Sequence, residues 1–124
     1  MKPSQIIKQY AQRAGLDTTR ALVTVQYILT HGLGFLLNKK DTVVLLIKIS
    51  PHVYEAHIAT QDSPVMLTRA MTSIFKDIKK LKIKRMYGNA NNYQIILLMK
   101  RIIDRVGGKI DFPDKQGYNW MIIV

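Results

Sequence analysis

Residues 52–87 read HVYEAHIATQDSPVMLTRAMTSIFKDIKKLKIKRMY, and this stretch decides the fold. Its first nine residues predict a β-strand, which follows a turn marked by Ser50 and Pro51. After a polar turn at 61–64, apolar residues recur at helical spacing from Leu67 to Ile78, and residues 82–87 predict a second strand. A strand–helix–strand unit of this length predicts a right-handed crossover between parallel strands.

The residues before this unit predict two helices followed by a hairpin. Ser4 is the expected cap of the first helix, which Gly15 ends, and Asp17 is the expected cap of a second helix that ends near Thr30. Residues 33–37 and 42–49 predict two strands joined by a polar turn. The apolar residues that the second helix is expected to bury are Ala21, Leu22, Val25, Ile28 and Leu29.

The residues after the unit predict one more helix and a terminal hairpin. Asn91 or Asn92 caps this helix, and the glycine pair at 107–108 closes it. Residues 109–112 and 118–124 predict the hairpin, with Tyr118 and Trp120 near the edge of the sheet. The predicted fold class is α/β (α+β), with a mixed, mostly antiparallel central sheet and helices on both faces. We expect a single domain over residues 1–124.

Composition narrows the function classes. Of the 124 residues, 48% are hydrophobic, which is enough for a buried core. The 19 Lys and Arg against 8 Asp and Glu give a net charge of +11, which attracts polyanions. Cysteine is absent, which excludes disulfides and thiolate chemistry, and three widely spaced histidines predict no metal site. We expect no targeting segment, because charged and polar residues interleave through the first twenty positions. We expect no membrane span, because the uncharged stretch 21–38 contains polar residues.

Two ionisable side chains lie close together on the central strand. Glu55 and His57 are two residues apart, so a strand directs both to the same face of the sheet. One interpretation is a proton-accepting pair in a catalytic cleft. The alternative is a polar, half-exposed sheet face on which His57 forms a hydrogen bond without a catalytic role.

A dense group of cations ends the crossover helix and continues into the next strand. Their structural interpretation is a solvated helix end, where positive charge is favourable. Their functional interpretation is a patch that binds nucleic-acid phosphates without sequence specificity, because aromatic residues do not interleave with the charges. The group comprises Lys76, Lys79, Lys80, Lys82, Lys84 and Arg85, opposed by Asp77. A second cluster on the last helix, which can merge with it in space, comprises Lys100, Arg101, Arg105 and Lys109.

The order of elements and two short motifs resemble the GNAT family of N-acetyltransferases. The sequence YEAHI at 54–58 looks like the E-x-H pattern on the central strand of short GNAT-like proteins from tailed bacteriophages. The sequence RMYGN at 85–89, followed by a helix, Gly-Gly and a terminal hairpin, resembles the second half of those proteins. The resemblance covers residues 33–124.

This resemblance implies transfer of an acetyl group from acetyl-CoA to an amine. Glu55 or His57 would take the proton from the amine, and diverging strands beside the central strand would leave a slot for the pantetheine arm. Backbone N–H groups at the start of the crossover helix would bind the pyrophosphate. The resemblance assigns cofactor contacts to Val65, Met66, Leu67, Arg69 and Asn91, and no metal.

Two departures from the family pattern bear on this activity. GNAT enzymes usually carry a glycine-rich loop before the crossover helix, whereas residues 61–64 here read QDSP and include the negative Asp62. Many members also have a Tyr inside the last helix, and residues 94–104 contain none. These departures favour a catalytically degenerate protein of phage origin that acts through binding.

Such a protein would work in the virion or in the host cytoplasm, as a virion-internal, structural or host-modulating component with protein partners. Two alternatives stay open. One is a divergent N-acetyltransferase that uses acetyl-CoA. The other is a basic module that binds nucleic acid non-specifically, with no membrane partner in either case.

Overall fold

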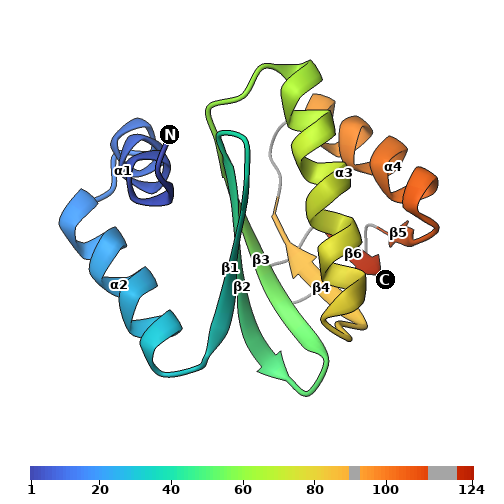
Figure 1. Cartoon of the computed structure of the whole chain (residues 1–124), viewed down its shortest axis with the longest axis horizontal. Coiled ribbons are helices and arrows are strands. Elements are labelled where there is room, and N and C mark those ends of the chain that lie inside the picture. Colours follow the sequence, from blue (N-terminus) through green and yellow to red (C-terminus); the bar gives the residue numbers. More distant parts are fainter. Residues whose placement is uncertain (90–92, 112–119) are drawn as a thin grey trace.

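The computed structural model describes residues 1–89, 93–111 and 120–124, and its elements follow the predicted order (Figure 1). A helical pair opens the chain, three strands follow, and helices then alternate with the remaining strands. The helices are α1 (Pro3–Arg13), α2 (Thr18–Thr30), α3 (Pro64–Lys80) and α4 (Tyr93–Val106). The strands are β1 (Gly34–Lys39), β2 (Thr42–Ser50), β3 (Val53–Thr60), β4 (Arg85–Gly88), β5 (Lys109–Asp111) and β6 (Trp120–Ile123).

The strands form one mixed sheet in the order β1-β2-β3-β4-β6-β5. The β3–β4 pair is parallel and the other pairs are antiparallel, which confirms the predicted crossover. The parallel ladder is short, because it runs only from the Val53–Arg85 pair to the Glu55–Tyr87 pair. Beyond Glu55, residues 56–60 of β3 pair with β2. The sheet therefore opens between β3 and β4 on the side where α3 begins (Figure 1).

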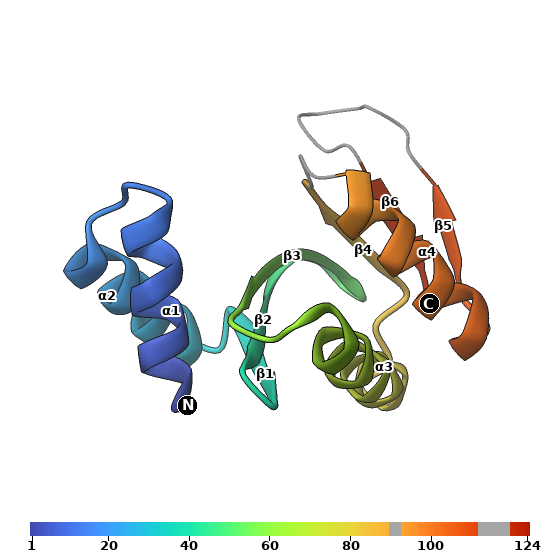
Figure 2. The same ribbon diagram turned by 90° about the horizontal axis from the view of Figure 1, so that it is seen from above.

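The main core lies on the face of the sheet that α3 and α4 cover (Figure 2). The apolar stripe of α3 predicted from its spacing is buried here, and α4 adds Met99, Ile102 and Ile103. Residues at alternate positions of the strands complete it, as expected of a sheet with one covered face. The fully buried side chains of this core include Val44, Leu46, Ile74, Ile78, Met86, Ile102, Ile103 and Ile122.

The opposite face carries the α1–α2 pair and a smaller core. Ile6 of α1 packs against Val43 and Ala59 of the sheet. By contrast, α2 contacts the sheet mainly near β1, so the predicted burial of its apolar side is wrong in part. Ile28 is buried, but Leu29 is 38% exposed and Ala21, Leu22 and Val25 are only partly buried. Helical periodicity marks an apolar side, but it does not set how closely that side approaches its neighbour.

Two further expectations are corrected. The first helix starts at Pro3 and is not capped by Ser4, because proline fits the first helical position and Gln5 accepts the Lys2 N–H at 3.0 Å. Trp120 is buried, because β6 lies between β4 and β5 and not at the sheet edge. Tyr118 lies outside the described residues. Among the helices described, none has the length and apolar character needed to cross a membrane.

Candidate functional site

The ionisable pair on β3 lies on the face of the sheet that α1 and α2 cover. His57 Nε2 is 2.5 Å from Glu55 Oε1, and the cross-strand neighbours of the two residues are Leu45 and Ile47. The His57 side chain is 55% exposed and that of Glu55 is 29% exposed. The structure thus brings the two predicted residues together on one face, while their catalytic role stays a prediction.

The contact between the two side chains also determines which ring nitrogen of a neutral His57 carries the proton. A carboxylate oxygen accepts hydrogen bonds, so a neutral His57 ring carries its proton on Nε2, facing Glu55. The lone pair of the ring then lies on Nδ1. The geometry therefore gives the two residues different capacities: His57 can accept a proton, and Glu55 orients the ring.

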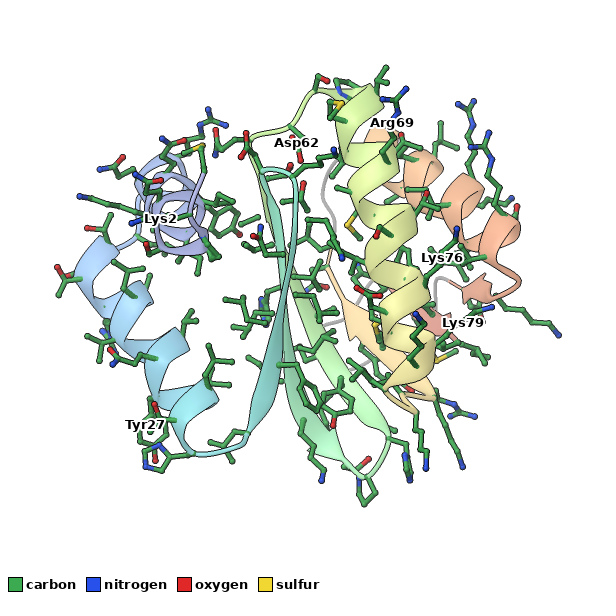
Figure 3. The ribbon with its side chains drawn as sticks, in the orientation of Figure 1. Lys2, Tyr27, Asp62, Arg69, Lys76 and Lys79 are labelled. Atoms are coloured by element: carbon green, nitrogen blue, oxygen red, sulfur yellow. The ribbon has the colours of Figure 1, made fainter. Side chains whose placement is uncertain are left out.

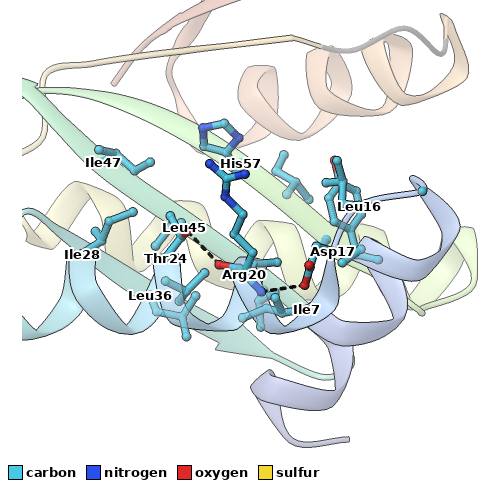
Figure 4. Close-up of a pocket in the computed structure, with 18 residues that line it drawn as sticks. Ile7, Leu16, Asp17, Arg20, Thr24, Ile28, Leu36, Leu45, Ile47 and His57 are labelled. Atoms are coloured by element: carbon cyan, nitrogen blue, oxygen red, sulfur yellow. Dashed lines mark hydrogen bonds between the residues drawn. The ribbon is translucent and has the colours of Figure 1, made fainter.

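A groove of about 560 Å³ separates the α1–α2 pair from the sheet, and His57 lines it (Figure 4). It exists because α2 approaches the sheet only near its C-terminal end. Its size falls in the range of small-molecule pockets, roughly 300–1,000 Å³. Most of the lining is apolar, supplied by Ile7, Ala11, Leu16, Ala21, Val25, Ile28, Leu36, Val43, Leu45, Ile47, Ile58 and Ala59.

Arg20 of α2 enters this groove and is directed at His57 (Figure 4). Its backbone is held in place, since its N–H donates to Asp17 Oδ1 at 3.0 Å and its carbonyl accepts the Thr24 hydroxyl at 2.8 Å. Its guanidinium forms no ion pair with the residues that the structure describes. Sequence reasoning missed Arg20, because only the packing of α2 against the sheet brings it near His57. The one available signal was its position one helical turn before Thr24, on the side of α2 that includes Ile28.

The start of α3 is the predicted pyrophosphate site, and most of its backbone donors are already in use. Pro64 has no N–H, and the Met66 N–H donates to Ser63 Oγ at 3.4 Å. The Leu67 N–H makes the first regular helical bond, to the Ser63 carbonyl at 2.8 Å. Val65 is the predicted contact whose N–H is left without a partner among the described residues. A pyrophosphate normally requires several such donors.

Asp62, just ahead of this helix, is fixed by hydrogen bonds to the β1–β2 hairpin. Its Oδ2 accepts the Thr42 hydroxyl at 2.7 Å and the Asp41 N–H at 3.1 Å, and its own N–H donates to Thr60 Oγ1 at 3.0 Å. The negative charge is therefore held in place near the start of α3. In the same turn, Gln61 Nε2 is buried without a hydrogen-bond partner in the part of the chain that is described.

The other predicted cofactor residues are less informative. Arg69 is exposed near the start of α3, close to the end of the sheet where Asp62 lies (Figure 3). Leu67 packs against the main core, which leaves only its backbone for a ligand. Asn91 lies outside the described residues. Within the described ranges, no group of three or more His, Asp or Glu side chains could hold a metal ion.

The structure joins the two clusters of cations. Lys79 Nζ donates to the carbonyl of Val106, so the C-terminal ends of α3 and α4 lie side by side, and Lys76 lies on the same side of α3 (Figure 3). Asp77, which opposes the first cluster, pairs with Lys39 at 3.5 Å. Exposed cations from both clusters are Lys76, Lys79, Lys80, Lys82, Lys84, Arg85, Lys100, Arg101, Arg105 and Lys109.

Comparison with known proteins gives a likeness of fold. No protein-family model matches the chain, and no curated protein matches it either. Among solved structures, a ribosomal-protein-alanine N-acetyltransferase from Brucella melitensis is similar, with a TM-score of 0.52 and 10% identity over 87% of this chain and 76% of that one. A Bacillus subtilis acetyltransferase in complex with CoA has a TM-score of 0.47 and 16% identity, covering 81% and 79%. An IAA acetyltransferase from Bacillus cereus ATCC 14579 has a TM-score of 0.49 and 13% identity, covering 98% and 89%.

The chain therefore has the acyl-CoA N-acyltransferase-like fold of the GNAT acetyltransferases. The features that define it are the mixed sheet, the short parallel β3–β4 ladder and the crossover helix α3. At 10% identity, this likeness concerns the fold and not the activity.

Proposed function

We propose that this GNAT-fold chain acts by binding an apolar ligand in the groove between α1–α2 and the sheet, and that it does not transfer acetyl groups. The observation that carries the proposal is the small number of free backbone N–H groups in the first turn of α3. Pro64 has no N–H and the Met66 N–H donates to Ser63 Oγ, which leaves the Val65 N–H as the free backbone donor of this turn among the described residues. The fixed carboxylate of Asp62 adds repulsion toward a pyrophosphate.

The groove supports the binding part of the proposal. Its lining is largely apolar, and Arg20 and His57 are polar groups that can orient a ligand within it. The resemblance of residues 33–124 to short phage proteins supports a role in the virion or in the host cell, where the occupant could belong to a protein partner.

The first experiment is thermal unfolding with acetyl-CoA, together with an assay of a broad panel of amines. We expect neither a shift in melting temperature nor an acetylated product at millimolar acetyl-CoA. A cofactor present at a thousand times its Kd would add about 4 kcal/mol to the free energy of unfolding, which such a scan detects easily. Stabilisation accompanied by amine acetylation would overturn the proposal.

The second experiment tests the groove with anilinonaphthalene sulfonate, an apolar fluorescent anion. Ala21→Trp places an indole in the groove and should reduce dye binding to the folded protein. Val23→Trp is the matched control, because Val23 is on the same helix but is 59% exposed and outside the groove lining. Equal dye binding by wild type and Ala21→Trp would contradict the proposed site.

A second candidate function is a divergent amine acetyltransferase. The Glu55–His57 contact favours it, because Nδ1 of an oriented His57 can take a proton from an amine. The divergence of β3 and β4 and the unpartnered Gln61 Nε2 also favour it. Acetyl-CoA would supply the thioester. If this candidate holds, His57→Gln should abolish transfer while acetyl-CoA still raises the melting temperature.

A further inference from the structure

The cationic end of the molecule consists of the exposed cations of α3, α4 and the segments that follow each helix. Its two halves are joined directly, since Lys79 Nζ donates to the Val106 carbonyl at the end of α4. Lys79 Nζ also lies 3.3 Å from the position that a Cβ on Gly107 would occupy. The members of the cationic end are Lys76, Lys79, Lys80, Lys82, Lys84, Arg85, Lys100, Arg101, Arg105 and Lys109.

Hydrogen bonds hold the backbone of the segment between α3 and β4, from which several of these side chains extend. His52 Nδ1 lies 2.9 Å from the Lys82 carbonyl oxygen, and the His52 carbonyl accepts the Lys84 N–H at 2.8 Å. The Lys84 carbonyl in turn accepts the Val124 N–H at 3.0 Å. A preorganised cationic surface loses less conformational entropy on binding than a flexible tail does.

Little negative charge opposes the cationic end. Asp77 pairs with Lys39, so it does not neutralise the neighbouring lysines of α3. Within 76–85 and 100–109 the other acid is Asp104, against ten cations in the same two segments. Those cations form no ion pair with the described part of the chain. Such a surface has a strongly positive potential and attracts polyanions.

The residue types indicate which polyanion fits. Residues 76–85 and 100–109 contain no Ser, Thr, Asn, Gln, Tyr or Trp. These two segments therefore supply neither the hydroxyl and amide groups that contact RNA 2′-hydroxyls nor the stacking platforms that bind single strands. Lysine and arginine contacts to phosphates alone suffice for duplex DNA. We propose that the cationic end binds duplex DNA through its phosphates without reading the base sequence, independently of the groove.

The test is fluorescence anisotropy with a labelled DNA duplex of about 20 base pairs, using two unrelated sequences. If about five phosphates are neutralised, the slope of log K against log salt is about −4.5, so affinity falls about 500-fold between 50 and 200 mM salt. We expect this salt dependence and equal affinity for the two sequences.

Two pairs of substitutions locate the binding surface. Lys80→Glu with Lys84→Glu should weaken binding at least tenfold and make the slope less negative by about 2. Lys8→Glu with Arg13→Glu makes the same change in net charge on exposed residues of α1 and should have a much smaller effect. Lys80→Gln with Lys84→Gln avoids placing acids near the end of α3 and should weaken binding in the same direction, by a smaller factor.

Three results would overturn the proposal. In the first, binding is absent or insensitive to salt. In the second, the α1 pair weakens binding as much as the pair on the cationic end, so net charge alone is responsible. In the third, an RNA duplex or a single strand binds more tightly than the DNA duplex.

Discussion

The hydroxyl of Thr42 lies 2.7 Å from Oδ2 of Asp62 and 2.7 Å from the hydroxyl of Thr60. Thr42 is fully buried, so its hydroxyl is the interior link of a small network that joins the start of β2 to the end of β3 and to the turn before α3. This network gives Asp62, the acid in that turn, a structural role.

Thr42→Val should therefore destabilise the fold. Valine has a similar volume, but it lacks the hydroxyl that bonds to both Thr60 and Asp62. The Thr60 hydroxyl and Asp62 Oδ2 then each lose a hydrogen-bond partner, which costs about 1–3 kcal/mol. Chemical denaturation measures the loss. Thr19→Val, on an exposed position of α2, should change the free energy of unfolding by less than about 0.5 kcal/mol. Equal effects of the two substitutions would exclude the network as the cause.

The contribution of the α3 cap can be measured by comparing Ser63 with Ser4, a serine that caps no helix. Ser63→Ala removes the acceptor of the Met66 N–H and should cost about 0.5–1 kcal/mol, at the low end for caps because the bond is 3.4 Å long. Ser4→Ala should be nearly neutral, since α1 starts at Pro3 and Ser4 is not its cap. If Ser4→Ala cost as much as Ser63→Ala, the helix start seen at Pro3 would be wrong.

Glycine at position 88 leaves the space that the indole ring of Trp120 occupies. A Cβ at this position would collide with the indole ring, because buried Gly88 at the end of β4 pairs with buried Trp120 at the start of β6. Gly88→Ala should destabilise the protein by about 1–3 kcal/mol through overpacking. Adding Trp120→Phe should recover part of that loss, because the smaller ring leaves room for the methyl group. A double-mutant cycle with no coupling would contradict the contact.

The proton on His57 is directly observable. In alkaline solution, long-range ¹H–¹⁵N spectra should show the neutral ring with its proton on Nε2, because that atom faces Glu55 Oε1. Glu55→Ala should shift the ring toward a mixture of the two tautomers. A wild-type ring protonated on Nδ1 would show that Glu55 does not orient His57.

Local patterns predicted much of this fold. The turn before residue 52 and the helical spacing at 67–78 identified β3 and α3, and the length of the connection identified the parallel crossover. The two-residue spacing of Glu55 and His57 on a strand placed both on one face. These features depend on residues that are near in sequence, so one chain suffices to read them.

The features that were missed depend on how distant elements pack. Arg20 lines the groove only because the N-terminal part of α2 stands away from the sheet, and the same separation leaves Ala21 and Val25 only partly buried. Trp120 is buried because of the order of strands, which a linear pattern does not encode. The cap at Ser4 was wrong because Pro3 and Gln5 together provide a better start two residues earlier, with Lys2 as the cap.

The three-pair ladder between β3 and β4 has a consequence for how the molecule opens. The β1–β2–β3 half and the β4–β6–β5 half share few backbone hydrogen bonds, and α3 joins them by packing on β1 and β2 and against α4. Cooperative opening units tend to separate where such bonds are fewest. Amide protons along this seam should therefore exchange with solvent earlier than those within either half, while α3 and the main core, which span both halves, hold them together.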